Sequence, residues 1–148
     1  MHVLRSILLR ALAYVIHLPA PLREGVPQRI LVIKPDHLGD LLLLTPALRH
    51  LRRTFPAAHI TLMIGPWSSA AVRGNPDIDV VLTCEFPGFT RRAKTSTFQP
   101  YLLLLRTALL VRAGQYDTAL IARDDHWWGA LLALLARIPR RIGYAAPS

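Results

Sequence analysis

Apolar and polar residues form alternating blocks along the chain, in a pattern typical of parallel α/β folds. Short runs rich in apolar residues, each of strand length, occur at 29–34, 59–64, 78–82, 118–122 and 141–144. Runs of this kind are typical of strands that are buried on both faces of a sheet. Their alternation with longer stretches predicts βαβ units, and hence a parallel sheet with helices on both faces.

The stretches between these runs predict the helices. We expect helices at about 40–55, 98–113 and 127–137, and a short helix or turn at 66–73. Pro46 lies inside the first of them, which predicts either a kink there or a helix that is regular only beyond it. Gly114 follows the second at a position where helices commonly end.

The first 18 residues show a different pattern. Placed at helical spacing, they form a basic polar stripe opposite an apolar one, and Pro19 and Pro21 then end the helix. We therefore separate an amphipathic helix and linker, residues 1–28, from an α/β domain at 29–148. The helix either packs on the surface of the domain or lies on an anionic inner leaflet. A signal peptide is disfavoured, because Arg10 interrupts the apolar region.

Composition narrows the class of partner. A length of 148 residues suits one α/β domain, and 52% hydrophobic with 18% charged residues argues against disorder. The net charge of +9 predicts an anionic partner: nucleic acid, a phosphorylated substrate or an acidic membrane surface. Nucleic acid is disfavoured because no RNA-binding motif or recognition helix is evident. Cys84 is the one cysteine, so a reducing, cytoplasmic location is the simpler expectation.

The loop after the first predicted strand is the first candidate site, because parallel sheets bind ligands at the carboxyl ends of their strands. Asp40 stands at the predicted helix start, and Lys34, His37 and Gly39 are candidates for substrate binding. The loop is neither a dinucleotide fingerprint nor a P-loop. Spacing alone favours Asp40 as a helix cap, and the alternative is a general base that takes a proton from a hydroxyl. A metal site made with Asp36 matches no established ligand pattern.

A polar cluster follows the fourth predicted strand and therefore belongs to the same edge of the sheet. It consists of Arg123, Asp124, Asp125 and His126, followed by Trp127 and Trp128. One aspartate is expected to cap the next helix, and the other, with the arginine and the histidine, could hydrogen-bond a sugar. The tryptophans either pack against the sheet or stack on that sugar.

A basic loop precedes the second long helix and contains Arg91, Arg92 and Lys94. Charged runs of this kind are usually solvated surface. The functional interpretation is a clamp for a phosphorylated, lipid-linked ligand, because arginine binds phosphate in a bidentate manner.

Several motifs together resemble one enzyme family. In chain order they are Leu38-Gly-Asp40, Thr45-Pro-Ala-Leu48, Arg73-Gly-Asn-Pro-Asp-Ile-Asp79, Tyr116-Asp117 and Pro139-Arg-Arg-Ile-Gly-Tyr144. Their order resembles the opening of the ADP-heptose:lipopolysaccharide heptosyltransferases, glycosyltransferase family 9. The resemblance extends roughly from Arg29 to the end of the chain.

The resemblance implies the N-terminal half of a GT-B fold, in which a Rossmann-like domain holds the acceptor and a second domain mainly holds the donor. The implied reaction is an inverting, metal-independent transfer of a sugar from a nucleotide-diphosphate sugar such as ADP-heptose, with Asp40 as the base. No further cofactor is implied. We expect residues 29–148 to be the acceptor-side domain, truncated before the donor-binding domain and inactive alone.

Two functions remain open at this point. The first is transfer to a lipopolysaccharide-core or related glycan or glycolipid acceptor, with peripheral contact with the anionic inner membrane. The second is a non-catalytic basic module that binds an anionic glycolipid or a membrane surface.

Overall fold

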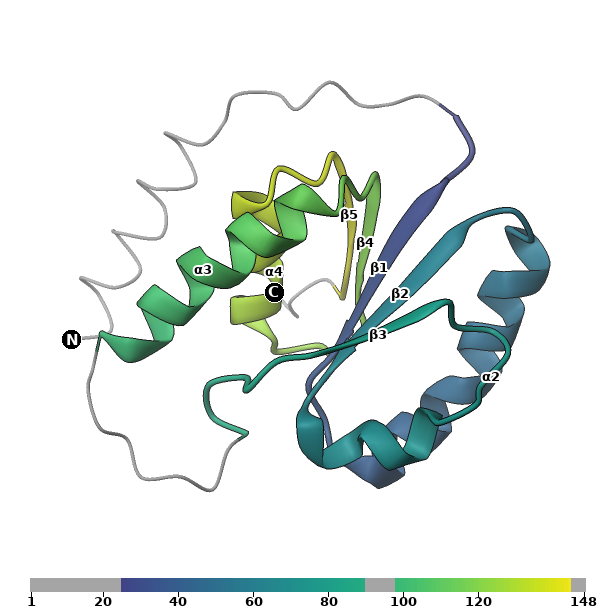
Figure 1. The fold of residues 1–148 in the computed structure, drawn as a ribbon, viewed down its shortest axis with the longest axis horizontal. Helices are drawn as coiled ribbons and strands as arrows, with labels where there is room; N and C mark the ends of the chain where they lie inside the picture. Colours follow the sequence, from purple (N-terminus) through teal and green to yellow (C-terminus); the bar gives the residue numbers. More distant parts are fainter. Residues whose placement is uncertain (1–24, 90–97, 145–148) are drawn as a thin grey trace.

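The computed structural model describes residues 25–89 and 98–144, which form a five-stranded parallel sheet flanked by helices (Figure 1). The strands are β1 (Arg29–Lys34), β2 (His59–Ile64), β3 (Val80–Thr83), β4 (Thr118–Ile121) and β5 (Arg140–Ile142). Their order is β3-β2-β1-β4-β5, and every neighbouring pair is parallel. The predicted Rossmann-like α/β class is therefore confirmed.

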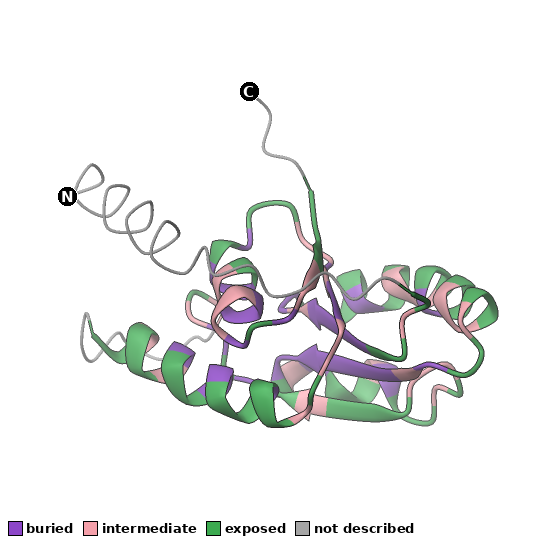
Figure 2. Ribbon diagram, turned by 90° about the horizontal axis from the view of Figure 1, so that it is seen from above, coloured by how far each residue is buried: buried purple, intermediate pink, exposed green. Residues whose placement is uncertain are grey.

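Helices cover both faces of the sheet. The helix α2 (Leu38–Thr54) and the 3-10 helix η1 (Pro66–Val72) lie on one face, and α3 (Gln99–Ala113) and α4 (Trp127–Leu135) on the other (Figure 1). Alternate residues of β1 point to opposite faces, so Ile30 and Val32 join one core while Leu31 and Ile33 join the other. Figure 2 shows the resulting pattern, with burial concentrated in the strands and on the inner sides of the helices.

Pro46 does not interrupt α2, which runs unbroken through it. A proline lacks the N–H that would bond the carbonyl four residues earlier, here that of Leu42. The hydroxyl of Thr45 donates to that carbonyl instead, at 2.6 Å. The neighbouring side chain thus replaces the missing backbone bond, and the alternative of a helix that is regular only beyond Pro46 was wrong.

The third strand begins two residues later than the predicted 78–82. Asn75 holds the preceding residues in a turn, because its side-chain oxygen accepts from the N–H of Asp77 at 2.9 Å and its carbonyl accepts from that of Ile78 at 3.4 Å. Pairing begins only when the N–H of Asp79 reaches the carbonyl of Ile60, at 2.9 Å. A side-chain hydrogen bond of the turn therefore delays the strand.

Two of the motif residues, Asp117 and Asp79, hold strands together. The Asp117 carboxylate accepts from the N–H groups of Gln28 and Arg29, both at 2.8 Å, and so joins the starts of β1 and β4. The Asp79 carboxylate accepts from Arg52 and from the N–H of Ile60, both at 2.6 Å, and so joins α2, β2 and β3. The hydrogen bonds of these two carboxylates therefore stabilise the fold.

Two predictions fall outside the described residues: the amphipathic helix within residues 1–28, apart from the end of its linker, and the clamp of Arg91, Arg92 and Lys94. Within 25–89 and 98–144, no helix combines the length and the apolar character that crossing a bilayer would require.

Candidate functional site

The carboxyl ends of the strands meet at one edge of the sheet, as parallel pairing requires. The chain moves from β1 outward to β2 and β3, then returns to β4 on the other side of β1. The loops after β1 and β4 therefore diverge, and this switch point is where open α/β sheets bind ligands. The Lys34 ammonium, at the end of β1, donates to the carbonyl of Ala122 just after β4, at 3.0 Å.

Asp36 is the centre of the contacts between these loops. Its carboxylate is buried, lies 2.9 Å from the ammonium of Lys34, and accepts a short hydrogen bond from the guanidinium of Arg123. Its backbone carbonyl accepts from Trp67 at 3.2 Å and from the hydroxyl of Ser68 at 2.8 Å. Asp36 therefore fixes the loop after β1 against β4 and against η1.

Asp40 lies in the first turn of α2, and its side chain is exposed. The helix cap is His37, so the prediction that Asp40 itself caps the helix was wrong. Beside it, a Cβ built on Gly39 would meet no atom within 4 Å, so the backbone faces open space. Asp40, His37 and Gly39 thus form an exposed rim at the start of α2.

The loop after β4 differs from the prediction in its capping. The cap of α4 is His126, not Asp124 or Asp125, and no side chain caps that helix. The Asp125 carboxylate accepts from Arg123 at 2.6 Å, and this hydrogen bond lowers the pKa of Asp125. The Asp124 side chain accepts from the N–H of Asp125 at 3.1 Å. Arg123 therefore bridges a buried carboxylate, Asp36, and an exposed one, Asp125.

His126 is buried although it belongs to this loop. Its ring contacts those of Phe86, Phe89 and Trp128, and neither ring nitrogen has a hydrogen-bond partner among the described residues. Burial, followed by the nearby charge of Arg123, lowers the pKa of His126 to about 4. The imidazole is therefore neutral at physiological pH and belongs to the apolar core.

The two tryptophans have different positions. Trp128 is buried, and its indole N–H donates to the carbonyl of Pro100 at 3.2 Å, so it packs in the core as one prediction stated. Trp127 is partly exposed and, with Tyr144, lines an open cleft of about 680 Å³ beside the ends of β4 and β5. Arg123, Asp124 and Asp125 line the same cleft.

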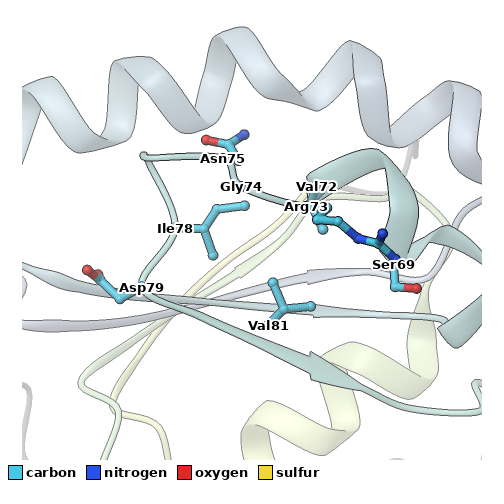
Figure 3. Close-up of a pocket in the computed structure, with 8 residues that line it drawn as sticks. All are labelled: Ser69, Val72, Arg73, Gly74, Asn75, Ile78, Asp79 and Val81. Atoms are coloured by element: carbon cyan, nitrogen blue, oxygen red, sulfur yellow. The ribbon is translucent and has the colours of Figure 1, made fainter.

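A second pocket, of about 340 Å³, lies between η1 and β3 (Figure 3). None of the predicted site residues lines it. Two of its polar residues, Asn75 and Asp79, already hold the turn and the strand pairing described above. We therefore place the candidate site at the carboxyl edge and not in this pocket.

Asp36 brings Lys34 and Arg123 together, and Arg123 in turn binds Asp125. Sequence reasoning considered Asp36 only for a metal site and missed its role as the link between the loops, because its partner Arg123 is 87 residues away. Among the described residues, no group of three or more histidine, cysteine, aspartate or glutamate side chains is placed to hold a metal ion.

Solved structures provide the comparison with known proteins. The chain matches the glycosyl transferase family 9 protein of Veillonella parvula with a TM-score of 0.64 and 26% identity over 79% of this chain. The chain resembles glycosyltransferase family 9. The ADP-heptose lipopolysaccharide heptosyltransferase II of E. coli has the same fold, with a TM-score of 0.63 and 24% identity over 78% of this chain. The resemblance to family 9 that the motifs predicted is thus confirmed.

The match to family 9 is partial in length. The chain spans 32% of the Veillonella parvula protein and 30% of the E. coli protein, about a third of each. No family model and no curated protein sequence matches the chain.

Proposed function

We propose that this chain is the acceptor-side domain of a heptosyltransferase-like glycosyltransferase, with Asp40 as the catalytic base. The observation that carries the proposal is that the Asp40 carboxylate, unlike those of the other aspartates, has no partner among the described residues. Within the described residues, which include all seven aspartates of the chain, six have a hydrogen-bond or ion-pair partner for the carboxylate and Asp40 has none. Its carboxylate is exposed at the switch point and available to a substrate.

The chemistry assigned to Asp40 is proton removal. A sugar hydroxyl is a poor nucleophile until its proton has an acceptor. As the hydroxyl oxygen bonds to the anomeric carbon of the donor, its proton passes to the Asp40 carboxylate. The bond from the anomeric carbon to the diphosphate breaks, and the nucleotide diphosphate leaves with the electron pair.

The remaining candidates would hold the acceptor. Lys34, His37 and Gly39 come from the loop after β1 and the first turn of α2, and Arg123, Asp124 and Asp125 from the loop after β4. We propose a glycan or glycolipid acceptor between these loops, with any phosphate bound by the basic residues, Arg91, Arg92 and Lys94 included. In a protein of family 9 length, a second domain would bind the nucleotide-diphosphate sugar.

The test is the change Asp40→Asn in a protein that joins this domain to a donor-binding domain. The amide of asparagine has the size of the carboxylate but accepts no proton, so turnover should fall by about 10²–10⁴-fold. Acceptor affinity and melting temperature should stay close to those of the unmodified protein, because no described contact uses the carboxylate.

Wild-type turnover in Asp40→Asn would exclude Asp40 as the base. If the unmodified protein binds glycolipid but turns over no nucleotide sugar, the chain is the non-catalytic basic module instead.

A further inference from the structure

The helix α3 is apolar on two opposite sides, and only one of them is packed. Its inner side, with Leu104, Ala108 and Val111, is buried against the sheet and α4. On the opposite side Leu102, Leu105 and Leu109 are 52%, 54% and 69% exposed. In Figure 2, α3 carries exposed positions along its whole length. A helix that is apolar all round normally has both sides covered.

Two arginines lie beside these leucines. At 100° per residue, the three leucines fall within a sector of about 60°, with Arg106 just beyond one side of it and Arg112 just beyond the other. Both arginines are exposed, and no acidic residue occurs between Gln99 and Ala113. We call Leu102, Leu105, Arg106, Leu109 and Arg112 the outer face of α3.

We propose that the outer face of α3 docks on the surface of an anionic lipid bilayer. The leucines would enter the boundary between headgroups and acyl chains, and the two arginines would reach the lipid phosphates on either side. A helix of 15 residues is about 22 Å long, so it would lie flat in the interface without crossing it. This inference does not rest on the proposed function, since a chain without transferase activity would dock in the same way.

Charge decides between the bilayer and the other occupants of such a face. A second copy would bring an identical face with the same arginines and a chain of net charge +9, so like charges would meet. The amphipathic helix predicted for residues 1–18 contains no acidic residue that could pair with Arg106 or Arg112. An anionic bilayer supplies both an apolar interior and negative charge.

The first experiment measures sedimentation of the full chain with vesicles of phosphatidylethanolamine and phosphatidylglycerol, or of phosphatidylcholine alone. The triple change Leu102→Gln, Leu105→Gln and Leu109→Gln should lower partition into the anionic vesicles by about tenfold or more. Leu43→Gln on α2, where the leucine is 80% exposed, is the matched control and should leave partition unchanged.

The arginines provide a separate measurement. Arg106→Gln and Arg112→Gln should each lower partition into anionic vesicles by about fivefold, with no change on the neutral ones. Arg53→Gln, an exposed arginine of α2, is the control for loss of charge alone. Circular dichroism should be unchanged for all variants, because none of these side chains is buried.

The second experiment locates the contact. Leu105→Cys carrying an environment-sensitive fluorophore should shift to the blue on anionic vesicles, whereas the same label at Leu43→Cys should not. Cys84 will not compete for the label, since it is buried and burial raises the pKa of its thiol to about 11. Wild-type partition of the triple variant into anionic vesicles would overturn the proposal. So would the finding that the unmodified chain is a dimer in solution and that the triple change dissociates this dimer.

Discussion

Arg123, two residues beyond β4, donates to the buried carboxylate of Asp36, two residues beyond β1, and so joins the two loops that diverge at the switch point. Lys34 meets the same carboxylate from the end of β1 at 2.9 Å. Asp36 is therefore surrounded by cations and closed off from solvent, whereas Asp40, four residues later, is exposed. One short stretch of chain thus holds a buried carboxylate that joins the two loops and an exposed carboxylate that faces solvent.

Replacing Asp36 should destabilise the fold strongly. Asp36→Asn leaves the ammonium of Lys34, whose side chain is only 15% exposed, without its counter-charge. Breaking a buried ion pair from one side typically costs about 3–5 kcal/mol. Urea unfolding of the isolated chain measures the loss. The control is Asp125→Asn, which removes the exposed partner of Arg123 and should change stability little. An equal loss in both variants would contradict the central role of Asp36.

Two glycines at helix starts should respond in opposite ways to alanine. Gly39→Ala adds a methyl group into open space and should raise stability by about 0.5 kcal/mol, because alanine favours the helix. Gly129→Ala places a Cβ 2.4 Å from the ring of the buried His126 and should lower stability by about 1–3 kcal/mol. Thermal unfolding of the two variants measures both changes.

The same Gly39→Ala change tests the acceptor site. If the acceptor passes over the start of α2, the added methyl group should lower its affinity while the domain becomes more stable. Unchanged acceptor binding in the stabilised variant would place the acceptor elsewhere.

His126 should make stability depend on pH in acid. Its pKa is about 4 in the folded chain, below the ordinary value of 6.5, so the unfolded chain binds more protons between these values. The contribution of His126 to the free energy of unfolding is therefore fully present above pH 6.5. As the pH falls toward 4, that contribution is lost, and the loss is on the order of 3 kcal/mol.

The variant His126→Leu isolates this effect, because leucine cannot titrate and suits the aromatic surroundings. The difference in unfolding free energy between wild type and His126→Leu should change between pH 6.5 and 4. His50→Leu, at an exposed position on α2, should show no such change. If the difference in unfolding free energy between wild type and His126→Leu stays constant from pH 6.5 to 4, the imidazole gains a partner when it is protonated.

Thr45 and Pro46 should be coupled. Thr45→Val removes the hydroxyl that bonds the carbonyl of Leu42 and should cost about 1 kcal/mol. Pro46→Ala restores a backbone N–H to the same carbonyl, so Thr45→Val should cost less in that background. A double-mutant cycle by urea unfolding measures the coupling, and additive losses would show that the hydroxyl is not the replacement donor.

The sequence predicted the elements better than the contacts between them. The apolar run of β1 and the alternation of strands and helices were sufficient for the fold class, since both are local patterns. The predictions that Asp40 and one of Asp124 and Asp125 cap the helices were wrong, because the residues at the capping positions are His37 and His126. The burial of Asp36 and His126 depends on residues distant in sequence, which no local pattern reveals.

The isolation of Asp40 has a consequence for how such chains diverge. Selection for folding would retain this aspartate only weakly, because no described hydrogen bond or ion pair depends on its side chain and its charge adds little at the start of α2. Asp79 and Asp117 would persist under the same selection, since each joins neighbouring strands. In a lineage that had abandoned sugar transfer, position 40 should therefore drift while the strand-joining aspartates stay. Under the role proposed for Asp40, the residue at that position would separate working enzymes from inherited scaffolds across related genes.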